Sequence, residues 1–156
     1  VVIMEYELEI KDEMSELEKF VREEATKYLN STMFLSCISS HHPNLDSVVE
    51  KGKDVVPYVV KLYRENGEYS SQNMYTHFFL LVMQNLYGNP FQGYVGMNFA
   101  IKYWLKRYDH NVLEYNKDTD RDKYNSFLLD FLDCKDMDEL NKLKAELEAK
   151  DNEQTK

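Results

Sequence analysis

The chain has 156 residues, of which 43% are hydrophobic and 13% aromatic, and its formal net charge is −9. A chain of this length can bury about 68–70% of its unfolded surface, so we expect one domain with a single core rather than a disordered protein. Its two cysteines, Cys37 and Cys134, are too few and too far apart for a disulfide framework, which favours a reducing, cytoplasmic location.

The apolar runs and the charges argue against three further classes: membrane-spanning, secreted and nucleic-acid-binding proteins. No run reaches the ~18 consecutive apolar residues of a membrane span, and the first residues, VVIM, lack the basic start and long apolar region of a signal peptide. Acid outnumbers base by nine to four in residues 1–30 and by fourteen to eight in residues 109–156, whereas residues 31–108 hold five acids and seven bases. Direct binding of nucleic acid needs clustered Lys and Arg, so it is not expected.

The N-terminal residues 4–10, MEYELEI, alternate apolar and acidic side chains. Period-two alternation predicts a short β-strand, and no second strand pattern follows to pair with it. Such a strand needs a mate in the chain, in another subunit or in a partner. The alternatives are that these residues extend the first helix or are partly disordered.

The rest of the chain is predicted to be helical, because apolar residues recur at helical spacing between capping residues and Gly or Pro stops. The predicted fold class is all-α: a compact orthogonal bundle of six or seven helices in one domain over residues 1–150, with residues 1–10 as a strand or arm and 151–156 as a disordered tail. The expected helices span residues 13–29, 45–51, 55–66, 74–87, 97–108, 124–134 and 137–149, and Asp136 is expected to cap the last one.

The central stretch, residues 42–104, carries the most apolar helices. We expect Asn44 to cap the helix that Gly52 stops, and the next helix to carry Pro57 in its first turn, an order typical of a HEAT-type helix pair. Phe79, Phe99 and Trp104 are predicted to face the core.

Residues 31–105 resemble a family of small, uncharacterised, all-helical bacterial proteins. The resemblance rests on the order of seven short motifs: Thr32–Phe34–Leu35–Ser36, His42–Pro43, Val48–Val49–Gly52, Val56–Pro57, His77–Phe78–Phe79, Gly88–Asn89–Pro90 and Trp104–Leu105. The chain departs from the family at His77–Phe78–Phe79–Leu80, where His-Trp-Phe-Trp is common, and in a longer loop before His77. The resemblance implies an all-helical fold and carries no catalytic residue.

Three histidines are the candidates for chemistry. Cys37 and His41 are four residues apart and His42 follows, but a zinc site needs three or four ligands and nothing nearby completes the set. We therefore expect His42 to form hydrogen bonds at the turn into Pro43, His41 to be solvated and His77 to be a satisfied core residue.

No enzyme motif is complete. Residues 116–127 begin like a calcium-binding loop, with Asn116, Asp118 and Asp120, but Arg121 stands where glycine is needed and Phe127 where glutamate is needed. No nucleophile elbow or phosphate-binding loop is present. We expect no catalytic residue, cofactor or metal.

Interaction with another protein is the function that this pattern favours. The first hypothesis is a non-enzymatic protein-binding module, accessory to a mobile-element or toxin–antitoxin-like system. The second is an acidic inhibitor that covers a basic, nucleic-acid-binding surface of another protein, and the third is a metal-dependent hydrolase that uses His42 or His77.

The predicted contact residues lie at the two ends of the chain. They are Tyr6 and Leu8 of the N-terminal strand and Leu140, Leu143 and Leu147, which form a narrow apolar seam on the last helix. The seam packs either on this chain or on a partner helix. A two-fold homodimer would use each such surface twice.

Overall fold

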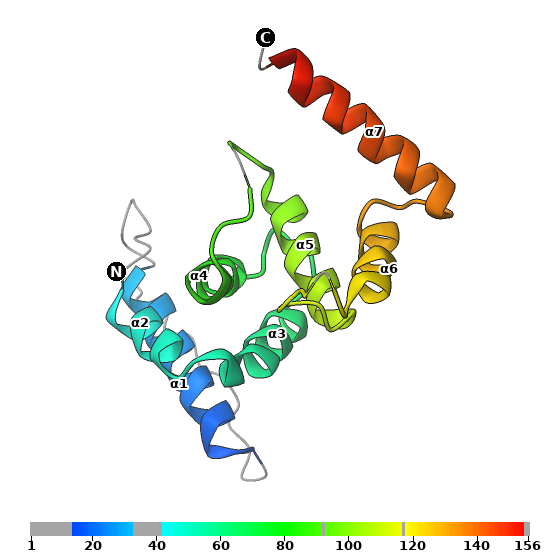
Figure 1. Ribbon diagram of the computed structural model, residues 1–156. Helices are drawn as coiled ribbons and strands as arrows, with labels where there is room; N and C mark the ends of the chain where they lie inside the picture. Colours follow the sequence, from blue (N-terminus) through cyan, green and yellow to red (C-terminus); the bar gives the residue numbers. More distant parts are fainter. Residues whose placement is uncertain (1–13, 33–41, 92, 117, 155–156) are drawn as a thin grey trace. The chain divides into compact units, whose positions relative to one another are not determined.

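A computed structural model describes residues 14–32, 42–91, 93–116 and 118–154 (Figure 1). Within these ranges the structure contains seven α-helices, one short 3₁₀ helix and no strand. The helices are α1 (Glu16–Thr32), α2 (Pro43–Glu50), η1 (Lys53–Val55), α3 (Val56–Glu65), α4 (Thr76–Tyr87), α5 (Met97–Asp109), α6 (Arg121–Phe131) and α7 (Met137–Gln154). The all-α fold class is thereby confirmed.

The chain divides into two compact units, Val1–Ile101 and Lys102–Lys156, with the boundary inside α5. Whether they form the single domain predicted over residues 1–150 stays a prediction. The predicted strand, residues 4–10, lies outside the described residues. At the other end, α7 continues to Gln154, so four residues of the predicted disordered tail, 151–154, are helical.

The core of unit 1 is built by α1 to α4. In Figure 1, α1 and α2 lie side by side, and α4 packs against both α2 and α3. Aromatic rings fill the centre: Tyr63 of α3 stacks on Phe79 of α4 with 4.9 Å between ring centroids, and Tyr28 of α1 meets Phe78 of α4 at 5.5 Å. Phe79 is fully buried, as predicted.

An ion-pair network joins α1 to α3. The Arg22 guanidinium donates to both carboxylate oxygens of Glu65, at 2.9 and 2.8 Å, and the Lys61 ammonium lies 2.8 Å from Glu18. Glu18 and Arg22 are themselves buried. The hydrogen bond from Lys61 holds the pKa of the Glu18 carboxyl below its usual value despite the opposing effect of burial.

The start of α2 explains the role of His42. Its Nδ1 accepts a hydrogen bond from the backbone N–H of Asn44 at 3.2 Å, with Pro43 in the first helical position. The expectation that His42 forms hydrogen bonds at this turn is confirmed. The expectation that Asn44 is the cap is wrong, because the Asn44 amide instead donates to Glu24 of α1 at 2.6 Å.

Unit 2 has a smaller core made by the end of α5, the loop after it and α6. Val112, Phe127 and Phe131 are buried there, and Tyr103 of α5 packs edge-on against both phenylalanines. Trp104, also of α5, is 1% exposed, as predicted.

Two further sequence expectations have opposite outcomes. Asp136 caps α7, because its carboxylate accepts the backbone N–H of Glu139 at 2.9 Å, as predicted. Phe99 does not face the core: it is 45% exposed and meets the ring of Phe91 at 5.7 Å. In the first turn of α5, a face that the apolar pattern predicts to be buried is therefore exposed to solvent.

Candidate functional site

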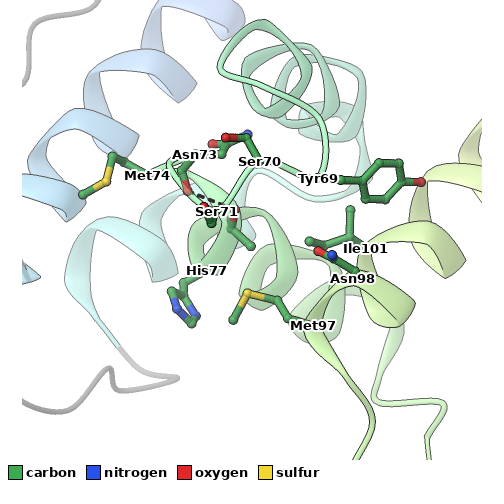
Figure 2. A pocket seen from close by; sticks show the side chains of 10 residues that line it. Tyr69, Ser70, Ser71, Asn73, Met74, His77, Met97, Asn98 and Ile101 are labelled. Carbon is green, nitrogen blue, oxygen red and sulfur yellow. Dashed lines mark hydrogen bonds between the residues drawn. The ribbon is translucent and has the colours of Figure 1, made fainter.

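A pocket of about 410 Å³ opens in unit 1 between the loop that precedes α4 and the first turns of α4 and α5. The loop contributes residues between Tyr69 and Met74, and α5 contributes Met97, Asn98 and Ile101. Figure 2 shows the α5 side chains on one side and the loop side chains facing them, with Tyr69 and Met74 pointing to opposite sides. The volume lies within the range typical of small-ligand pockets.

The loop wall is held from inside by one buried amide. The Asn73 side chain is 6% exposed and donates both amide hydrogens, to the carbonyl of Tyr63 at 2.8 Å and to that of Gly67 at 2.9 Å. Its oxygen accepts the backbone N–H of Tyr75 at 2.9 Å. Three hydrogen bonds from one side chain thus tie the end of α3, the turn after it and the start of α4 together.

A second contact fixes an unusual backbone conformation in the same loop. Tyr69 has φ of 63°, in the left-handed region that residues with a side chain rarely adopt. Its N–H donates to the buried hydroxyl of Tyr63 at 2.8 Å. Burial raises the pKa of Tyr63 above its ordinary value. Strain of this kind persists where the surroundings hold it in place, and here it turns the Tyr69 side chain outward.

The surface of the pocket is uncharged and adaptable. Among the described residues that line it, none is Asp, Glu, Lys or Arg. Ile101 is 1% exposed and supplies a buried apolar wall, whereas Met74 and Met97 are about half exposed, at 46% and 44%. Methionine side chains are flexible and polarizable, so such walls adjust to the shape of an occupant.

His77 lines this pocket from the first turn of α4 and is exposed. The prediction of a satisfied core histidine is therefore wrong. The buried residues of α4 are Thr76, Phe78, Phe79, Val82 and Met83. Because consecutive helical residues are turned by about 100° from one another, Phe78 faces the core while His77 faces the pocket.

The other predicted contact residues are not brought into this site. Tyr6, Leu8 and His41 lie outside the described residues, as does the side chain of Leu147. Leu140 is fully buried where α7 packs against α6, so of the two alternatives it packs on this chain. Leu143 is half-buried, and its contact with a partner stays a prediction.

Unit 2 contains a cluster of charged side chains of its own, separate from the ion-pair network of unit 1. The Asp130 carboxylate lies 2.9 Å from Nε2 of His110 and 3.1 Å from the Lys106 ammonium. Its hydrogen bond with His110, followed by that with Lys106, holds the pKa of Asp130 below the usual value. No group of three or more His, Cys, Asp or Glu residues that could hold a metal ion occurs in the described part of the chain.

Comparison with known proteins adds no relative: no protein-family model, curated protein or solved structure matches this chain. Among the helices that the structure describes, none is long and apolar enough to cross a membrane.

Sequence reasoning missed the pocket because its loop wall depends on contacts that a local pattern does not contain. The one available signal was Asn73, three residues before the start of a helix. Asparagine at such a place is typical of turns and helix caps. Its acceptors, however, lie six and ten residues earlier in the chain.

Proposed function

We propose that the protein is a non-enzymatic protein-binding module and that the pocket in unit 1 is the centre of its contact surface. The observation that carries this proposal is the place of the exposed apolar side chains. Of the seven large hydrophobic residues that are exposed in the described part of the chain, five fall between residues 69 and 99: Tyr69, Met74, Tyr94, Met97 and Phe99.

Three of these five line the pocket, namely Tyr69, Met74 and Met97. Exposed apolar groups next to a concave surface are typical of sites where another molecule binds. Tyrosine and methionine are also enriched at the centres of protein–protein interfaces, where charged residues are depleted. The absence of Asp, Glu, Lys and Arg among the described lining residues agrees with such a centre.

The experiment compares two single substitutions in the full chain. Met97→Asp places a charge in the pocket wall, and Met137→Asp places one at a similarly exposed methionine of α7 in unit 2. Each variant and the wild type are used to capture partners from the cells that express the protein, with quantitative mass spectrometry as the readout. We expect Met97→Asp to lose the bound protein and Met137→Asp to keep it, because an uncompensated charge at an apolar contact costs several kcal/mol.

Circular dichroism and thermal unfolding of both variants establish that each is folded. Equal capture by Met97→Asp and the wild type contradicts the proposal. Loss of the same protein from both variants contradicts it as well, because the pocket would then be no more important than α7.

Ionic strength separates this proposal from the acidic-inhibitor hypothesis. Residues 109–156 carry fourteen acids, but the structure uses several of them internally: Asp133 pairs with Lys102 at 3.0 Å, and Asp136 caps α7. Binding through an uncharged pocket responds little to salt, whereas binding through an acidic surface weakens steeply. A place in a mobile-element or toxin–antitoxin-like system stays a prediction.

A further inference from the structure

We infer that the pocket is an anchor site for one uncharged aromatic side chain, of the Phe or Trp kind, presented by the partner protein. This inference rests on the proposed function and adds the chemistry of the contact. It follows from three properties of the lining: its lack of charge, the internal use of its buried polar groups, and the residue types that form its walls.

The lack of Asp, Glu, Lys and Arg in the described lining argues against a charged anchor side chain. Arg and Lys would need a carboxylate inside the pocket, and Asp and Glu would need a cation, because a charge removed from water without a partner is strongly destabilising. None of the described lining residues is Asp, Glu, Lys or Arg. The anchor is therefore uncharged.

The buried polar groups favour an apolar anchor over a polar one. Both amide hydrogens of Asn73 are already donated to backbone carbonyls, and the Thr76 hydroxyl donates to the carbonyl of Asn73 at 3.0 Å. These donors are satisfied before any partner arrives. An apolar side chain can then enter without leaving the buried Asn73 amide or Thr76 hydroxyl unpaired, which would cost about 1–3 kcal/mol for each group.

The walls favour an aromatic ring over an aliphatic chain. Met74 and Met97 provide two thioether side chains, and sulfur makes favourable contacts with the edges of aromatic rings. His77 adds a ring to the pocket wall, which can pair edge-on or offset with a second ring. In Figure 2, His77 and Met97 lie at the same end of the pocket, so an anchor there meets both kinds of group.

The test uses the full chain with ¹³C-methyl-labelled methionines and small amino-acid amides as probes. N-acetyl-phenylalanine amide, and the corresponding leucine, lysine and glutamate amides, are titrated while the methyl signals of the seven methionines are followed. We expect the phenylalanine probe to shift the Met74 and Met97 methyls by its ring current. The buried Met83 and the exposed Met137 of unit 2 should not move.

The apparent affinity for the phenylalanine probe should exceed that for the lysine and glutamate probes by at least about tenfold. The reason is that binding of either charged probe would bury a charge without a partner. The affinity for the phenylalanine probe should also exceed that for the leucine probe. Equal responses to all four probes, or no response of Met74 and Met97, would overturn the inference. A leucine response as strong as that to phenylalanine would overturn its aromatic part.

A pair of substitutions provides an internal version of the same test. Ser71→Phe places a ring in the pocket wall, and Ser126→Phe places one at an exposed serine of α6. We expect Ser71→Phe to shift the Met74 and Met97 methyls without any probe and to abolish their response to it, whereas Ser126→Phe does neither. An unchanged response in Ser71→Phe contradicts the inference. If Ser71→Phe does not fold, as the Met83 signal would report, the wild-type titration decides.

The outcomes separate this inference from the proposed function. In one outcome, Met97→Asp loses the captured protein but the wild type does not respond to the probes. The protein-binding function is then supported and the aromatic anchor is contradicted. A selective response to the phenylalanine probe, with capture by Met97→Asp unchanged, removes the protein-binding function and leaves the aromatic selectivity of the pocket.

Discussion

The loops that follow α3 and α5 are built on the same backbone device and held by opposite chemistry. Each contains a non-glycine residue with positive φ, Tyr69 at 63° in the first and Asn111 at 56° in the second. The first loop is held by Asn73, a neutral amide within the loop itself. The second is held by Arg107 of α5, whose guanidinium donates to the carbonyls of Val112, at 3.0 and 2.7 Å, and Leu113, at 3.1 Å.

The difference determines what each loop can present to a partner. The amide of Asn73 forms its hydrogen bonds with backbone carbonyls, so no charged side chain is needed to hold the first loop. The described residues that line the pocket beside it include no Asp, Glu, Lys or Arg. The second loop is surrounded by charge: Arg107 reaches its carbonyls, and His110, at its start, pairs with Asp130 together with Lys106. A loop held by a neutral amide is compatible with an apolar contact surface beside it. A loop held by ionic contacts makes the stability of the surrounding structure sensitive to pH and salt.

The largest expected effect is that of Asn73→Ala. It removes three hydrogen bonds that join α3, the loop and the start of α4, although the carbonyls of Tyr63 and Gly67 each keep a backbone N–H donor. We therefore expect the free energy of unfolding in urea to fall by about 2–4 kcal/mol. The matched control is Asn85→Ala, which removes one exposed hydrogen bond to the carbonyl of Leu81 and should change stability by less than about 0.5 kcal/mol. Equal effects of the two substitutions would mean that Asn73 does not hold the loop.

Arg107→Ala is the corresponding test of the second loop. It removes charge-assisted hydrogen bonds to two carbonyls and one to the hydroxyl of Tyr103 at 2.7 Å, and we expect a loss of about 2 kcal/mol in the same assay. Arg107→Lys should recover less than half of this loss, because an ammonium cannot reproduce the planar fork. A lysine variant as stable as the wild type would show that charge alone is sufficient.

The smallest effect concerns pH. The pKa of Asp130 is lowered in the folded state, so its stabilising contribution is fully present above the unfolded carboxyl pKa, about 3.9. That contribution is lost as the pH falls through the lower folded pKa. We expect the stability difference between wild type and Asp130→Asn to be below about 1 kcal/mol at pH 7, because the pair is partly exposed.

Unfolding curves at several pH values would show this difference shrinking below pH 4. The effect of Asn73→Ala should show no matching change, because an amide does not titrate. A stability difference for Asp130→Asn that does not depend on pH would contradict the ionic description of the second loop.

The sequence was sufficient for the fold class because helix boundaries depend on local features. The helix after Pro43, the start of α5 and the cap at Asp136 all follow from short-range spacing and backbone chemistry. The sequence did not determine how each helix is rotated about its axis, and therefore which of its faces is buried. Leu80 and Leu81 make α4 apolar nearly all round, so no polar face fixed which side was buried, and His77 was assigned to the core.

The site was less accessible to sequence reasoning than the helices. Periodicity placed Met97 and Asn98 at the start of a helix, but it does not reveal that Phe99 faces solvent or that Ile101 forms a wall of the pocket. The loop wall was hidden for a different reason: the acceptors of Asn73 are the carbonyls of two other segments. Such pairings follow from the folded path of the chain and not from spacing.

Site-specific photo-crosslinking tests the contact surface most directly. p-Benzoylphenylalanine is placed at Met74, at the edge of the pocket, or at the similarly exposed Met137 of α7, and the full chain is irradiated in the cells that express it. If the pocket is the contact surface, the Met74 position gives a discrete adduct with one protein, N-acetyl-phenylalanine amide reduces its yield, and the Met137 position gives no such adduct. The same adduct from both positions in equal yield, or no adduct from Met74, would contradict a partner-binding role for the pocket.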